Sequence, residues 1–88
     1  MESRKVRYSD TDLNGHLNNT KYIDYIIDTH DINFYNQYRV KSICINFEKE
    51  IQDNEVVEMY SNNSLPEVVS GKINNKVIFS SEITYERR

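Results

Sequence analysis

Alternation of apolar and polar residues fills the second half of this chain and limits most strongly how it can fold. In residues 76–86, one side of an extended chain would carry Val77, Phe79, Ser81, Ile83 and Tyr85. The opposite side would be mostly polar, as in a sheet that packs on one face only. Residues 40–51, 55–61 and 67–73 have the same strand character, and residues 5–9 indicate a shorter strand. The pattern therefore predicts a sheet of five strands.

One long amphipathic helix is predicted to cover this sheet. It spans residues 20–29 and follows Asn18 and Asn19, either of which can cap its first N–H groups. Its apolar stripe would consist of Tyr22, Ile23, Ile26, Ile27 and Thr29. The pair Asn74–Asn75 is typical of a tight hairpin turn between the last two strands. A five-stranded antiparallel sheet wrapped around one central helix, an α+β fold, satisfies every element, although periodicity alone also allows other small α+β sheets.

Composition excludes several classes of function. The net charge of −3 disfavours a nucleic-acid-binding role, because phosphate contacts need a basic surface. Cys44 is the one cysteine, so no internal disulfide can form, and a reducing, cytoplasmic setting is expected. We expect Cys44 to be a small core residue. No apolar stretch has the length of a membrane span, and no signal peptide is expected.

Polar side chains with catalytic potential recur in the loop before the helix. Asp12, Asn14 and His16 occupy alternate positions, and Asn18 follows at the helix start. In an extended segment this spacing would point the first three toward one side. A carboxylate can act as base or nucleophile, an imidazole can move a proton, and helix N–H groups can stabilise negative charge. However, Asp and Asn are also common in loops because they bond to their own backbone, so the residue types leave a structural role open.

The order of these residues resembles the signature of hot-dog-fold thioesterases. The matching positions are Arg7, Ser9, Asp10, Asp12, Asn14, His16, Asn18, Asn19 and Tyr22. The match is closest to the carboxy-terminal half of acyl-ACP thioesterases, and the later strands fit the same fold, so residues 1–88 are expected to form a single hot-dog domain. Acyl-CoA thioesterases of the four-hydroxybenzoyl-CoA type carry a looser version of the signature.

The resemblance implies a catalytic set of Asp12, Asn14, His16 and Glu50. Asp12 and Glu50 would act on the attacking water or on the carbonyl carbon, and Asn14 and His16 would orient them. The resemblance does not assign which carboxylate is the nucleophile. For Glu50, an exposed charge beside Lys49 is an equally good interpretation.

The neighbouring residues Asn18, Asn19 and Tyr22 are predicted to bind substrate. No cofactor is expected, because the chain has no glycine-rich phosphate loop. No metal site is expected either, because His30, with Asp31 nearby, lacks a second ligand at metal-binding spacing.

The chain departs from the family pattern in two ways. Plant members place a cysteine directly after the glutamate, whereas here Ile51 follows Glu50, and Cys44 is too early in the chain to replace it. We therefore expect carboxylate rather than thiol chemistry. Family members are also about twice as long, because two hot-dog halves lie side by side. The chain would then be a fragment, or two copies would pair along their strand edges as a homodimer or larger assembly.

These features predict a thioester hydrolase that acts on a fatty acyl group carried by acyl carrier protein, in fatty acid biosynthesis and lipid metabolism. Two alternatives stay open. One is an acyl-CoA thioesterase, and the other is a non-catalytic half-domain that lacks its partner hot-dog half.

Overall fold

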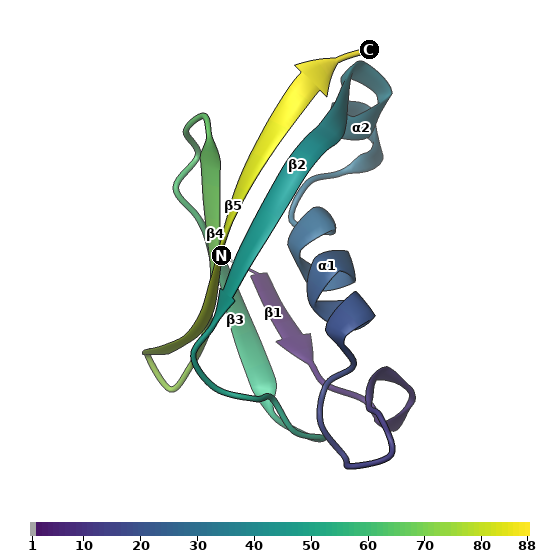
Figure 1. Ribbon diagram of the computed structural model, residues 1–88, viewed down its shortest axis with the longest axis vertical. Coiled ribbons are helices and arrows are strands. Elements are labelled where there is room, and N and C mark those ends of the chain that lie inside the picture. The colour runs from purple at the N-terminus through teal and green to yellow at the C-terminus, as the bar shows by residue number, and fades with distance from the viewer. Residues whose placement is uncertain (1) are drawn as a thin grey trace.

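A computed structural model describes residues 2–88 and shows one sheet with helices beside it (Figure 1). The strands are β1 (Glu2–Lys5), β2 (Tyr38–Phe47), β3 (Val56–Ser61), β4 (Glu67–Ile73) and β5 (Lys76–Arg87). The helices are the 3-10 turn η1 (Tyr8–Asp10), α1 (Asn19–Ile27) and α2 (Ile32–Gln37). The strands pair antiparallel in the order β1-β3-β4-β5-β2. This confirms the predicted α+β arrangement of a five-stranded antiparallel sheet and a central helix.

Helix α1 lies along one face of the sheet and begins at the predicted cap (Figure 1). The side chain of Asn18 accepts a hydrogen bond from the backbone N–H of Thr20 at 3.1 Å. The buried face consists of Tyr22, Tyr25 and Ile26, which follow the i, i+3, i+4 spacing of one helix side. Ile23 was predicted inside but lies one step around the helix and is exposed. Tyr25 takes its place in the core.

The hairpin of β4 and β5 departs from strict alternation. The register shifts between Gly71 and Lys72, so both Ile78 and Phe79 are buried on β5, whereas Val77 is exposed. Gly71 lies opposite Phe79, and the Phe79 ring occupies the space that a Cβ at position 71 would need. The prediction that Val77 points into the core was therefore wrong, because a two-residue period does not continue through a bulge.

Local side-chain hydrogen bonds changed two other predicted elements. The expected strand at residues 5–9 ends at Lys5 and gives way to η1, because the Asp10 carboxylate accepts the Arg7 N–H at 3.2 Å. Helix α2 was not predicted; its six residues are too few for a clear apolar stripe, and Asp31 caps it by accepting the Phe34 N–H at 3.0 Å. In the described residues, neither α1 nor α2 is long and apolar enough to cross a membrane.

Strand β2 forms one edge of the sheet and contradicts the prediction for Cys44. Ile43 and Ile45 pack against the core, so the intervening Cys44 points to the other face and is exposed. The strand also ends at Phe47, earlier than predicted, and residues 48–55 form the connection to β3. This connection and the loop before α1 lie together at the end of the molecule away from α2 (Figure 1).

Near α2, a buried carboxylate lies among hydrogen-bond donors. The exposed fraction of Glu67 is 2%, and Tyr85 donates its hydroxyl to Oε1 at 2.6 Å. His30 Nε2 lies 2.9 Å from the same oxygen, and the Ser61 hydroxyl donates to Oε2. Burial alone would raise the pKa of Glu67, but these hydrogen bonds outweigh it and hold the pKa below its usual value. Glu67, which sequence analysis missed, is thus a buried anion with saturated oxygens.

Candidate active site

The loop before α1 folds back on itself instead of running extended. One Asp12 carboxylate oxygen accepts the N–H groups of Asn14, at 2.8 Å, and His16, at 3.2 Å. The Asp12 N–H donates to the His16 carbonyl at 2.8 Å, and Gly15 adopts a φ of 76°, which glycine permits without strain. The expected extended geometry was therefore wrong. Asp12 closes a turn and brings itself and His16 together.

A short antiparallel contact then brings Glu50 to this loop. His16 pairs with Gln52, and the Leu17 N–H donates to the Ile51 carbonyl at 2.6 Å. As a result, His16 Nδ1 lies 3.0 Å from Glu50 Oε2. The two side chains are separated by more than thirty positions in the sequence, so only the folded chain creates the pair. The exposed fraction of the Glu50 side chain is 72% and that of His16 is 31%, so both remain accessible to a substrate.

Six of the seven predicted site residues line one cleft of about 570 Å³. They are Asp12, His16, Asn18, Asn19, Tyr22 and Glu50. Asn14 does not line this cleft, and its side chain is exposed. The structure therefore brings together an acid, an imidazole, a second acid and the first residues of α1, but it leaves the predicted amide outside.

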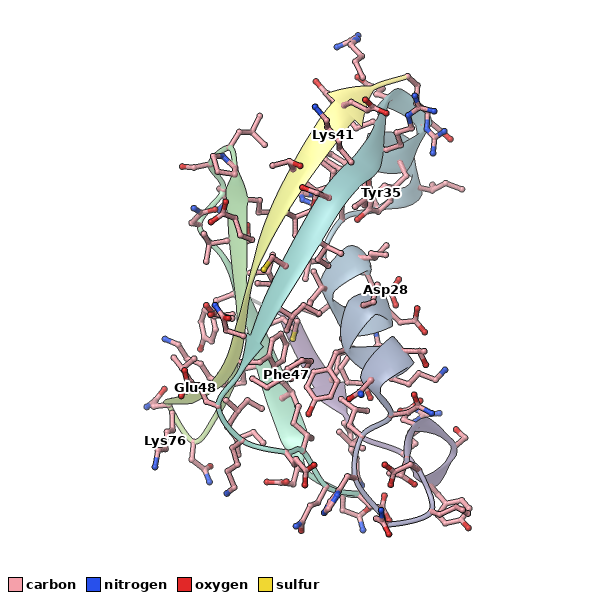
Figure 2. All side chains as sticks on the ribbon, viewed as in Figure 1. Asp28, Tyr35, Lys41, Phe47, Glu48 and Lys76 are labelled. Atoms are coloured by element: carbon pink, nitrogen blue, oxygen red, sulfur yellow. The ribbon has the colours of Figure 1, made fainter. Side chains whose placement is uncertain are left out.

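The cleft also has lining residues that sequence analysis did not select. These are Leu17, Phe47, Glu48 and Lys49. Phe47 is the last residue of β2 (Figure 2), and its ring meets the ring of Tyr22 on α1 edge-on with centroids 4.8 Å apart. Phe47 could have been found from its position at the end of an alternating apolar run. Glu48 and Lys49 could have been found because they directly precede Glu50.

Tyr22 and Asn18 have structural contacts in addition to their place in the cleft. Tyr22 is buried, and its hydroxyl accepts the Ile51 N–H at 3.3 Å, which ties the residue after Glu50 to α1. Burial raises the pKa of the Tyr22 phenol, which keeps it a neutral donor. The Asn18 oxygen accepts from both the backbone N–H and the hydroxyl of Thr20.

The cleft combines negative side chains with the positive end of a helix dipole. Asp12, Glu48 and Glu50 contribute carboxylates, and Lys49 contributes a cation. Asn18 and Asn19 place the amino terminus of α1 at the same cleft, where the positive end of the helix dipole can stabilise an anion. Among residues 2–88, no group of three or more His, Cys, Asp or Glu side chains is arranged to hold a metal ion. The arrangement suits acid–base chemistry beside a developing negative charge.

Comparison with known proteins shows the family of this chain. The family model described as the acyl-ACP thioesterase C-terminal domain matches residues 1–87. The chain belongs to this family. It is 26% identical over 73 residues to oleoyl-acyl carrier protein thioesterase 2, chloroplastic, from Arabidopsis thaliana. The matched region covers 83% of this chain and 20% of the relative.

Solved structures show the same fold. An acyl-ACP thioesterase from Bacteroides thetaiotaomicron VPI-5482 superposes with a TM-score of 0.88 at 26% identity, covering 97% of this chain and 36% of that one. A gentisyl-coenzyme A thioesterase superposes with a TM-score of 0.81 at 13% identity, covering 100% of this chain and 85% of that one. The chain is therefore a hot-dog domain, and it spans about a fifth of the curated relative and about a third of the bacterial acyl-ACP thioesterase.

Proposed function

We propose that this domain takes part in hydrolysis of a fatty acyl thioester carried by acyl carrier protein, in fatty acid biosynthesis. The observation that carries the proposal is the cleft in which Asp12, His16 and Glu50 meet the amino terminus of α1. Membership of the acyl-ACP thioesterase C-terminal domain family supports the same substrate class.

In this proposal the His16–Glu50 pair activates the attacking water. One Glu50 oxygen holds His16 Nδ1, which leaves the other carboxylate oxygen and His16 Nε2 for water and substrate. The water oxygen attacks the carbonyl carbon while its proton passes to the pair, and the resulting oxyanion lies at the positive end of the α1 dipole. The C–S bond then breaks, and the thiolate recovers the proton from the pair.

Asp12 has a different role from Glu50 in this scheme. Two backbone N–H groups occupy one of its oxygens, so the Asp12 carboxylate fixes the loop that carries His16 and presents its second oxygen to the cleft. Asn14 contributes its backbone N–H to this turn rather than its amide side chain. We assign substrate contacts to Asn19 and Tyr22. Asn18 is assigned a substrate contact in addition to its role as the cap of α1.

The direct test is Glu50→Gln, assayed on acyl-ACP. We expect kcat to fall about 100-fold or more, the contribution typical of a general base. Glu48→Gln is the matched control, because Glu48 lines the same cleft and is not paired with His16. Wild-type protein that leaves both acyl-ACP and acyl-CoA intact would refute the proposal.

Acyl-CoA is the second candidate substrate, and Lys49 is the observation that favours it. This cation lines the cleft and is able to contact a phosphate of coenzyme A. Hydrolysis rates on the two carriers, compared side by side, decide between them. Lys49→Gln should slow acyl-CoA hydrolysis more than acyl-ACP hydrolysis if acyl-CoA is the substrate.

Assembly belongs to the same proposal. Strand β2 lies at the edge of the sheet and ends at Phe47, which lines the cleft, so a chain that pairs along β2 would lie next to the site. We propose a homodimer; sedimentation as a stable monomer at micromolar concentration would contradict it. An exposed thiol such as Cys44 fits a reducing, cytoplasmic location. A non-catalytic half-domain would assemble but hydrolyse neither thioester.

A further inference from the structure

Asp10 joins three parts of the chain although it does not line the catalytic cleft. Its carboxylate accepts the Tyr25 hydroxyl at 2.8 Å and the Arg7 N–H at 3.2 Å. Its carbonyl accepts the N–H of Asn18, the cap of α1, at 2.8 Å. Asp10 therefore connects the segment that follows β1, the α1 residue Tyr25 and the cap of α1.

The loop that carries Asp12 and His16 begins and ends at this junction. Thr11 pairs with Leu17 next to the bond between Asp10 and Asn18, so the loop is closed at its base. At the tip, Asp12 makes hydrogen bonds within its own turn, and the Gly15 carbonyl accepts the Asp53 N–H at 3.3 Å. The base fixes where the loop leaves α1 and the first strand, and the contact with residues 51–53 fixes the other side of the turn that faces Glu50.

The Tyr25 side of the contact is rigid. Tyr25 is 1% exposed, and the Arg4 guanidinium lies 4.4 Å from its ring centroid. Arg4 Nη1 in turn forms an ion pair, 2.9 Å long, with Oδ2 of Asp28 at the end of α1. Because its ring is buried and Arg4 lies over it, Tyr25 holds its hydroxyl at a fixed place for Asp10.

We propose that Asp10 and Tyr25 are positioning residues, which hold the closed base of the loop so that His16 reaches Glu50. This inference rests on the proposed function for its catalytic consequence. Neither residue touches substrate; both act through the loop.

The test compares Tyr25→Phe with Tyr35→Phe in the full chain. Both remove one tyrosine hydroxyl that donates a hydrogen bond, but Tyr35 lies in α2 and donates to the Ile27 carbonyl, at 2.6 Å, far from the loop (Figure 2). We expect Tyr25→Phe to lower kcat on acyl-ACP about tenfold with KM changed less than about twofold, the size expected for one hydrogen bond to a charged group. Tyr35→Phe should leave kcat unchanged. Asp10→Asn keeps an oxygen acceptor and should retain more activity than Asp10→Ala.

Amide hydrogen exchange gives a readout that does not need activity. In Tyr25→Phe the N–H groups of Asp12 and Asn18 should exchange about tenfold faster, and in Tyr35→Phe they should not change. Unchanged exchange in Tyr25→Phe overturns the inference, as does faster exchange with a kcat equal to that of Tyr35→Phe. If the wild type hydrolyses no thioester but exchange responds as expected, the proposed function fails while the structural hold on the loop stands.

Discussion

The chain holds two histidine–glutamate pairs with almost the same separation, at opposite ends of α1. His16 Nδ1 lies 3.0 Å from Glu50 before the helix, and His30 Nε2 lies 2.9 Å from Glu67 after it. Their surroundings differ greatly. The exposed fraction of the side chain is 72% for Glu50 and 3% for Glu67.

The difference is the reason why we propose a catalytic role for one pair and a structural role for the other. Both Glu67 oxygens accept bonds from protein donors, Tyr85, Ser61 and His30, so the carboxylate has little capacity left to take a proton from water. Among residues 2–88, His16 is the one ion-pair partner of Glu50, and the Glu50 side chain lines the cleft. The same two residue types thus form a buried cluster in one place, and in the other they form the exposed pair to which we assign proton transfer.

Replacing each histidine by alanine should distinguish the two roles most strongly. His16→Ala is expected to lower kcat on acyl-ACP about 100-fold or more with little change in Tm, because it removes the partner of Glu50 from the cleft. His30→Ala should leave kcat within a small factor of wild type and lower Tm. Steady-state kinetics and thermal unfolding of both variants test this, and equal losses of kcat would remove the distinction.

Truncation of the buried Glu67 side chain is expected to have the largest effect on stability. Glu67→Ala leaves the donors of Ser61, Tyr85 and His30 without their acceptor and is expected to cost about 3 kcal/mol of unfolding free energy. Glu50→Ala should cost less than about 0.5 kcal/mol, because its site is on the surface. Denaturant unfolding measures both. A loss at Glu50 equal to that at Glu67 would contradict the comparison.

Acid should weaken the buried cluster specifically. Because the pKa of folded Glu67 lies below its ordinary value of 4.5, its stabilising contribution is complete above that value and is lost as the pH falls through the folded-state pKa. Asp10, whose pKa the Tyr25 and Arg7 bonds also hold low against the effect of burial, adds to the same trend. The difference in unfolding free energy between wild type and Glu67→Gln should therefore shrink as the pH falls below 4.5. A difference that does not depend on pH would show that Glu67 is not ionised in the fold.

The smallest effect is expected at the helix start. Asn18→Ala removes the cap of α1 and should lower the unfolding free energy by about 1 kcal/mol, whereas Asn19→Ala, one residue later, should cost less. Because Asn18 also lines the cleft, KM for acyl-ACP should be measured on the same two variants. If Asn19→Ala lowers the unfolding free energy as much as Asn18→Ala does, the capping hydrogen bond is not the source of the lost stability.

Much of the fold was predictable because it depends on short-range patterns. The strands from residue 38 onward and α1 follow the two-residue and 3.6-residue periods of their sequences. The cap at Asn18 follows from its side-chain chemistry. Where a local hydrogen bond or a bulge competes with the period, as at Asp10 and Gly71, the pattern gave the wrong answer for Val77 and for the first strand.

The sequence by itself determined which polar residues lie in the loop before α1, and its resemblance to a family added Glu50 to them. Only the tertiary structure decided that Asp12 closes a turn, that Asn14 does not line the cleft, and that Glu50 meets His16. It also placed Glu67 in the interior while Glu50 stays at the surface. The physical reason is that these features depend on contacts between segments far apart in the chain, which no local period encodes.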